Sequence, residues 1–350
     1  MTAQNFETIQ DVGIHELKRR LMNQIRKISG AEDSESDVLQ SIDHELVWFQ
    51  DGVHFDLTFH PFQALAQKCL TQITSRALVN GWMPIEGEKN GDIKLTLALP
   101  NQISVGMMEE FVAGLNAASE IDGIRISNIE VTAARAAFGV ACSFQYSIRE
   151  SPLGSSIAQK PKPGDAICVT GDLGAAFAGL RILLREKRIW TQQQELHKDP
   201  TIAFEPELEE YAESVKRQLA PVTRKDLVLA MQASQIWPTS LTLLQDGLYN
   251  DLQNLMIRTS VGAEIYESAL PISLTTREIA NELEEDVDRY AFLGGEDYEL
   301  VFTLPKDKVD AFQEHFQDFV VIGEVKPQKE QLLVHTTDRG IEKHRVNGKS

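Results

Sequence analysis

The stretch Gly294-Gly295-Glu296-Asp297-Tyr298-Glu299, followed by the apolar run 300–304, places two glycines and three carboxylates directly before a predicted strand. Adjacent glycines permit backbone angles that other residues avoid, so Glu296 and Asp297 can be directed into a cleft rather than along a sheet. Carboxylates presented in this way suit a cationic or hydroxyl-bearing ligand, or a metal ion. An ordinary Gly-Gly turn with solvated acids fits the same residues.

The composition indicates a soluble globular protein with more than one core. The chain has 350 residues, of which 42% are hydrophobic and 25% charged, and two domains are the natural expectation at this length. A formal net charge of −18 argues against a nucleic-acid or anionic-membrane surface, where basic patches supply most of the affinity. We therefore expect no nucleic-acid partner.

The compartment is predicted from the cysteines and from the first residues. Cys69, Cys142 and Cys168 lie far apart in the sequence, each in an apolar context, which favours reduced buried thiols over a disulfide framework or a zinc site. The first residues have neither a basic segment nor an apolar core, and the chain has no apolar run of about 18 residues. These features predict a cytoplasmic protein without a membrane segment.

Hydrophobic periodicity and turn residues predict alternating helices and strands. The expected helices are 5–28, 62–80, 105–120, 173–187, 207–219 and 306–317. The expected strands are 45–49, 53–59, 94–99, 138–146, 166–170, 262–267, 300–304 and 319–325, the first two joined at Asp51-Gly52. The proline-rich stretch 151–164 is the best boundary, which predicts an α/β (α+β) fold with domains 1–148 and 149–340.

A glycine-containing turn follows the strand expected at 166–170. Thr170-Gly171-Asp172-Leu173-Gly174 opens a helix, and free N–H groups at a helix start form an anion site. Gly171 and Gly174 are therefore candidates for binding the phosphates of ATP. The spacing matches neither a P-loop nor a dinucleotide fingerprint, and tight packing of the strand on the helix explains the glycines equally well.

Residues 292–305 resemble the corresponding segment of thiamine-monophosphate kinases, in the aminoimidazole-ribonucleotide-synthetase superfamily. The similarity is dense in 52–61, 163–185 and 246–252 and extends to about Val325. It implies an N-terminal domain whose sheets pair in a dimer barrel, an α/β C-terminal domain, and an active site between them. It also implies a homodimer that transfers the γ-phosphoryl group of ATP to thiamine monophosphate, giving thiamine diphosphate, with several Mg²⁺ ions.

The resemblance assigns roles to individual residues. His54 and Glu296 would bind the thiamine phosphate, and Asp246, in Asp246-Gly247, would be a Mg²⁺ ligand. Glu130 and Asp33 are the other carboxylates that remain near metal-ligand positions. From the residues alone, Asp246 is equally well an N-cap, and His54 a surface or packing residue.

Several of the family's metal-ligand positions are changed in this chain. The affected segments are Gly30-Ala31-Glu32-Asp33, Glu45-Leu46-Val47, Gln72-Ile73-Thr74-Ser75, Asn128-Ile129-Glu130-Val131 and Leu243-Leu244-Gln245-Asp246, and an expected arginine is Ala158. Because Mg²⁺ prefers oxygen ligands, chiefly aspartates, these changes leave a second hypothesis open. It is a catalytically inactive relative that keeps the fold as a ligand-binding or regulatory protein.

Overall fold

The computed structural model describes residues 39–48, 56–101, 103–135, 138–148, 160–327, 331–336 and 340–345. The helix expected over 5–28, the Asp51-Gly52 turn, Asp33 and His54 lie outside these ranges. Residues 40–350 form one unit that carries two β-sheets.

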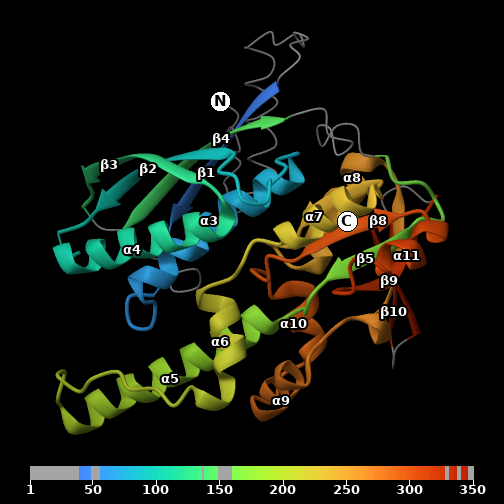
Figure 1. The fold of residues 1–350 in the computed structure, drawn as a ribbon. Helices are drawn as coiled ribbons and strands as arrows, with labels where there is room; N and C mark the ends of the chain where they lie inside the picture. The colour runs from blue at the N-terminus through green and yellow to red at the C-terminus, as the bar shows by residue number, and fades with distance from the viewer. Residues whose placement is uncertain are drawn as a thin grey trace, which may run out of the picture. The chain divides into compact units, whose positions relative to one another are not determined.

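The first sheet has the strand order β1-β4-β2-β3. Its strands are β1 (Leu39–Trp48), β2 (Gly91–Leu99), β3 (Arg125–Ala133) and β4 (Gly139–Ile148). On β2, buried Ile93, Leu95 and Leu97 alternate with exposed Lys94 and Thr96, the period of a strand with one covered face. Helices α3 (Phe62–Val79) and α4 (Val105–Asp122) cover that face (Figure 1).

The second sheet has the order β11-β10-β7-β9-β5-β8-β6. Its strands are β5 (Ala166–Thr170), β6 (Ser240–Leu243), β7 (Gly262–Tyr266), β8 (Leu300–Leu304), β9 (Phe319–Lys326), β10 (Gln331–Thr336) and β11 (Gly340–Arg345). All residues of β5, β6 and β8 are buried, so both faces of the sheet's centre are covered.

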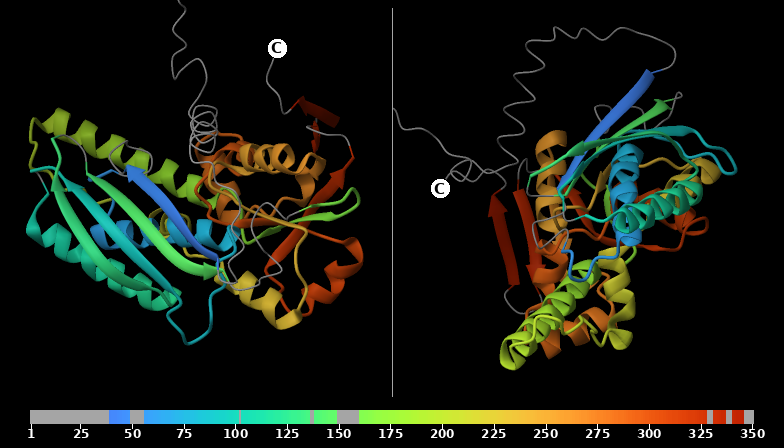
Figure 2. Two further views of the ribbon diagram at one scale, coloured as in Figure 1. Left: turned by 90° about the horizontal axis from the view of Figure 1, so that it is seen from above. Right: turned by 90° about the vertical axis from the view of Figure 1, so that its left-hand side faces the viewer.

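The helices of this half are of unequal length (Figure 2). They are α5 (Ala175–His197), α6 (Ala212–Leu219), α7 (Lys225–Ser234), α8 (Leu248–Thr259), α9 (Leu274–Glu282), α10 (Val287–Leu293) and α11 (Lys306–Gln313). Gly179 allows α5 and α6 to approach closely, because a Cβ there would lie 2.1 Å from the Ser214 carbonyl oxygen.

The mixed fold is confirmed, and most predicted elements lie within a few residues of their observed bounds. One strand is wrong in its described part: residues 56–60 form a turn instead, in which the Phe59 and His60 N–H groups donate to the Asp56 carbonyl at 3.2 and 2.9 Å. The polar edge strand β3 was not expected. Its pattern of exposed and half-buried residues lacks the apolar alternation that predicts a strand.

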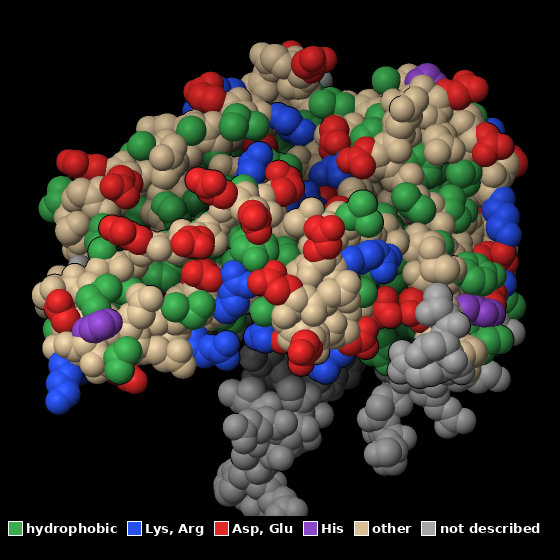
Figure 3. Space-filling view, turned by 90° about the horizontal axis from the view of Figure 1, so that it is seen from below, with side chains coloured by type: hydrophobic (Ala, Val, Ile, Leu, Met, Phe, Trp, Pro, Cys, Tyr) green, Lys and Arg blue, Asp and Glu red, His purple; other side chains and the backbone are tan. Residues whose placement is uncertain are grey.

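The three cysteines are buried thiols, as predicted. Two that are distant in sequence meet in the fold: the Sγ atoms of Cys69 on α3 and Cys142 on β4 are 3.1 Å apart. No helix among the described residues has the length and apolar character needed to cross a membrane. Figure 3 shows acidic side chains over much of one face, with lysines and arginines between them.

Candidate active site

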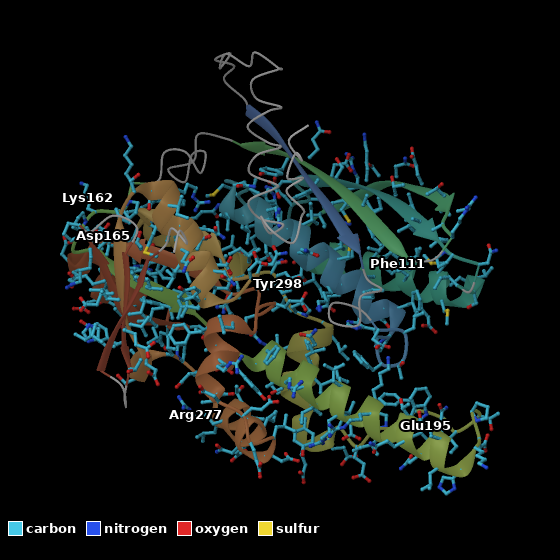
Figure 4. The ribbon with its side chains drawn as sticks, turned by 180° about the vertical axis from the view of Figure 1, so that it is seen from behind. Phe111, Lys162, Asp165, Glu195, Arg277 and Tyr298 are labelled. Carbon is cyan, nitrogen blue, oxygen red and sulfur yellow. The ribbon has the colours of Figure 1, made fainter. Side chains whose placement is uncertain are left out.

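Two loops that the sequence singled out lie side by side. The Glu296 N–H donates to the Gln245 carbonyl at 2.8 Å, and the Tyr298 N–H donates to the Leu244 carbonyl at 3.0 Å. These bonds extend the pairing of β6 with β8 beyond the strand ends. The Gln245-Asp246-Gly247 loop, here called the DG loop, is thereby joined to residues 294–299, here called the GGED segment. Tyr298 is labelled in Figure 4.

The GGED segment has an unusual backbone. Gly295, Glu296 and Tyr298 have φ angles of 73°, 60° and 53°, in the left-handed region that residues other than glycine seldom adopt. A left-handed residue turns the chain sharply, so successive side chains do not simply alternate across a sheet. Glu296, Asp297 and Glu299 therefore reach three different sets of partners.

Glu296 is held by α3. Its Oε2 atom accepts a hydrogen bond from Lys68 Nζ at 2.8 Å and another from Gln218 Nε2 at 3.1 Å. The Lys68 and Glu296 side chains are only 3% and 10% exposed. Two turns further along α3, Arg76 Nη2 donates to Gln245 Oε1 at 3.0 Å. Because residues four apart share a helix face, Lys68, Gln72 and Arg76 form a polar row, the α3 row, whose ends contact both loops.

Asp297 is held by backbone at the start of α5. Its Oδ2 atom accepts from the Gly174 N–H at 2.8 Å, and its Oδ1 atom accepts from the Ala176 N–H at 3.2 Å. Burial raises the pKa of Asp297 to about 7, against the opposing effects of these N–H groups and Arg217. The helix start proposed from sequence as a phosphate site thus donates to a protein carboxyl group.

Glu299 is fully buried between two arginines. It forms ion pairs with Arg217 and with Arg224, whose Nη1 is 2.5 Å from Oε2, and accepts from Thr170 Oγ1 at 2.5 Å. The carboxylate lies so close to Gly171 that a Cβ there would be 2.3 Å from Oε1. Gly171 therefore packs against an ion-pair network.

Asp246 is half-buried at the end of β6. Its N–H and that of Gln245 both donate to Asp251 Oδ2 at 2.9 Å, which fixes the loop from inside α8. Burial, with the nearby charge of Asp246, raises the pKa of Asp251 to about 7. The alternative of Asp246 as an N-cap is wrong: Gly247 holds the N-cap position of α8, no side chain caps this helix start, and Asp251 provides the carboxylate that accepts from the loop.

Glu130 lies elsewhere. It is exposed on edge strand β3, pairs in register with Thr96, and accepts from Asn128 Nδ2 at 3.3 Å. Thr96 is on the exposed face of β2, so Glu130 is on the face of the sheet away from α3. The structure thus gathers Glu296, Asp246, Gly171 and Gly174 around the two loops, with Glu130 outside this group.

The oxygen ligands that the described residues offer suit Mg²⁺ only if phosphates and water supply most of its coordination. Within the described ranges, no three His, Cys, Asp or Glu side chains gather closely enough to hold a metal ion. Mg²⁺ in phosphate-binding sites is commonly bound through one or two carboxylates, with substrate phosphates and water completing its octahedron. Asp246 suits that role, whereas a closed cage of protein carboxylates does not fit the described residues.

Sequence reasoning missed the cations of the site: Lys68, Arg76, Arg217 and Arg224. A signal existed in 62–79, where a lysine, a glutamine and an arginine recur at four-residue spacing within an otherwise largely apolar helix. Such spacing marks one helix face. It does not reveal which residues that face contacts.

Comparison with known proteins gives a consistent relationship, although no protein-family model matches the chain. The chain is 28% identical to the thiamine-monophosphate kinase of Aquifex aeolicus over 276 residues, which cover 79% of this chain and 78% of that protein. It is also 28% identical to the thiamine-monophosphate kinase of Pyrococcus abyssi over 235 residues, 66% of this chain and 63% of that one.

Solved structures share the fold. AaThiL complexed with AMPPCP and TMP superposes with a TM-score of 0.75 at 23% identity, covering 97% of this chain and 100% of that one. The HypE–HypF complex gives a TM-score of 0.64 at 14% identity, covering 93% and 99%. In sequence the chain is thus similar to thiamine-monophosphate kinases, as a divergent relative, and it shares the fold of their solved structures.

Proposed function

We propose that the protein transfers the γ-phosphoryl group of ATP to thiamine monophosphate, forming thiamine diphosphate. The observation that carries the proposal is similarity to a thiamine-monophosphate kinase over 79% of the chain. The two loops whose sequence first suggested this family are also in direct contact. The curated relatives above are both named as kinases, so they give no support to the alternative of an inactive ligand-binding protein.

Phosphoryl transfer between two anions depends chiefly on positioning and charge neutralisation. In this proposal Glu296, together with His54, positions thiamine monophosphate, and Gly171 and Gly174 lie near the phosphates of ATP. Lys68 fixes the direction of Glu296. The Gly174 N–H already donates to Asp297. The Asp297 carboxyl group would therefore have to move away from this N–H before a phosphate could accept its hydrogen bond.

Magnesium belongs to the same proposal. Asp246 would be its ligand among the described residues, with Asp33 a second carboxylate; Glu130, on the outer face of β3, is the weakest of the three expected ligands. When bound, the ion would neutralise phosphate oxygens. Asp251 holds the backbone of the DG loop by a hydrogen bond from the Asp246 N–H. The Asp246 residue itself is half-buried.

We also propose a homodimer built on the first sheet, with the two sheets assigned to domains 1–148 and 149–340. Support comes from the outer face of that sheet, where Lys94, Thr96 and Glu130 are exposed. A second copy of the chain would cover it. The cytoplasmic location expected from the cysteines also stays a prediction.

The test is thiamine diphosphate formation by the purified chain with ATP, Mg²⁺ and thiamine monophosphate. Asp246→Asn is expected to abolish Mg²⁺-dependent turnover, because it removes the metal's carboxylate while keeping nearly the same shape. Asp310→Asn, an exposed site on α11, serves as the matched control and is expected to leave turnover unchanged. A folded wild-type protein that forms no thiamine diphosphate would contradict the proposal.

A further inference from the structure

We propose that Cys69 and Cys142 form an oxidisable pair, a modification site at which a hydroperoxide converts two thiols into a disulfide that ties α3 to the first sheet. The site lies outside the two loops described above, and neither the sequence analysis nor the comparisons give it a chemical role. The chemistry of the pair does not depend on the proposed function, whereas its expected effect on turnover rests on that function.

Two different periodicities bring the thiols together. Cys69 lies in the middle of α3, on the face that carries the fully buried Leu65 and Ile73, because positions four apart share one face of a helix. Cys142 on β4 is paired in register with Leu95 of β2, whose side chain is on the covered face of the sheet. Both thiols belong to one hydrophobic core. They therefore meet where the helix packs on the sheet.

The distance between the two sulfur atoms carries the proposal. The Sγ atoms of Cys69 and Cys142 are 3.1 Å apart, and either thiol can donate its hydrogen to the other. A disulfide bond is about 2.05 Å long, so closing it needs an approach of about 1 Å, shared between the helix and the strand. The pair is thus already in contact in its reduced form, and oxidation requires only a small movement.

The third cysteine provides an internal contrast. The hydrogen bond between thiols in the described part of the chain joins Cys69 to Cys142, whereas Cys168 lies on β5 of the second sheet. Burial raises the pKa of the Cys168 thiol to about 12. Because the thiolate is the reactive form, Cys168 should resist oxidation. A hydroperoxide should therefore consume two thiols of the folded chain and leave the third.

The modification is a two-electron oxidation with hydrogen peroxide as the simplest oxidant. One thiolate attacks a peroxide oxygen, the O–O bond breaks, and the sulfur becomes a sulfenic acid while the other oxygen leaves as water. The second thiolate then attacks that sulfur, so that the S–S bond forms, the S–O bond breaks and a second water leaves. The pair loses two electrons and two protons, and one peroxide is reduced to two waters.

Burial sets the relative rates of these two steps. Cys69 and Cys142 are only 0% and 3% exposed, so the peroxide can reach a sulfur atom only when the contact between helix and sheet opens locally. The first step should therefore be slow. The second step joins atoms that are already in contact and needs no further reagent, so the sulfenic acid should be converted to the disulfide before more peroxide arrives.

The disulfide would act on a helix that contributes to the candidate site. Lys68 directly precedes Cys69 in α3, and its Nζ donates to Glu296 Oε2 at 2.8 Å. Drawing Cys69 towards β4 would displace Lys68 relative to the GGED segment. A displacement of about 1 Å at a positioned group can cost up to about 100-fold in rate. Oxidation is therefore expected to slow turnover, and reduction with dithiothreitol to restore it.

The experiment treats the folded full chain with hydrogen peroxide, counts the remaining thiols and locates the disulfide by peptide mass mapping. Wild-type protein is expected to lose two of its three thiols and to give a peptide linked through Cys69 and Cys142, which dithiothreitol separates. Cys69→Ala and Cys142→Ala should each form no internal disulfide. Cys168→Ala is the matched control and should form the disulfide as wild type does. The wild-type peptide map decides the matter where a variant fails to fold.

A map in which peroxide leaves both thiols unoxidised, or links either of them to Cys168, would overturn the assignment. Turnover assays on the same samples separate it from the proposed function. If the reduced wild type forms thiamine diphosphate and the cross-linked protein does so equally fast, the effect through Lys68 is wrong. If the disulfide forms but the reduced protein makes no thiamine diphosphate, the proposed function is wrong and the oxidisable pair stands.

Discussion

Neighbouring carboxyl groups of the GGED segment are stabilised in two different ways. Glu299 lies between the guanidinium groups of Arg217 and Arg224, whereas Asp297 accepts hydrogen bonds from the backbone N–H groups of Gly174 and Ala176. At Asp297 the two N–H groups and the charge of Arg217 do not outweigh the effect of burial. The pKa of Asp297 is accordingly raised to about 7. The ion pairs of Glu299 should contribute to the free energy of unfolding, and the buried carboxyl group of Asp297 should make that free energy depend on pH.

The largest effect should follow from removing Glu299. Glu299→Ala leaves two largely buried arginines without their shared carboxylate, and breaking a buried ion pair in this way costs about 3–5 kcal/mol of unfolding free energy. Urea unfolding measures the change. A loss below about 1 kcal/mol would mean that the network contributes no more than a surface ion pair. Glu299 would then not be stabilised more strongly than Asp297.

Gly171→Ala tests how closely that network is packed. Its φ angle of 58° is left-handed, and the new Cβ would lie 2.3 Å from Glu299 Oε1, so we expect a loss of about 1–3 kcal/mol. Gly87→Ala is the matched control, since Gly87 also has a left-handed φ of 77° but has open space around it. Equal thermal unfolding temperatures for the two variants would show that crowding at Glu299 contributes nothing.

Asp297 should make stability fall as pH rises. With a pKa of about 7 in the folded chain and 3.8 as the ordinary value, the folded state keeps a proton that the unfolded state has lost between about pH 4 and 7. Its contribution to stability is therefore present at low pH and is lost as pH rises through 7. Asp297→Asn should reduce the fall of the melting temperature between pH 5 and 8, compared with Asp310→Asn. An unchanged slope would assign the effect to other carboxyl groups whose pKa is raised, such as Asp251 and Asp288.

The smallest effect is expected at the surface and provides the baseline. Lys89 and Glu120 form an exposed ion pair, with side chains 46% and 69% exposed. Glu120→Gln should change the unfolding free energy by only about 0–1 kcal/mol, because water screens the pair. The same urea series measures it. A loss as large as that of Glu299→Ala would show that burial is not what separates the two pairs.

The sequence predicted elements whose hydrophobic pattern is decided locally. Strands β5 and β8 were placed at their observed bounds, since continuous apolar runs between turn residues can be recognised without tertiary information. The end of α5 and the polar strand β3 were not predicted, because both depend on packing partners that are distant in the sequence. At the site, the carboxylates were found from the unusual Gly-Gly motif. The cations that pair with them were missed. Lys68 on α3, for example, is a buried lysine that is explained only by the glutamate that it meets, 228 residues later.

The left-handed residues of the GGED segment have an evolutionary consequence. Because Glu296 contacts α3 and Asp297 contacts α5, inserting or deleting one residue would exchange the partners of two carboxyl groups at once. Selection should therefore tolerate changes of length in this segment less readily than changes of residue type. Homologous chains that have lost the activity would keep its spacing as long as they keep the fold.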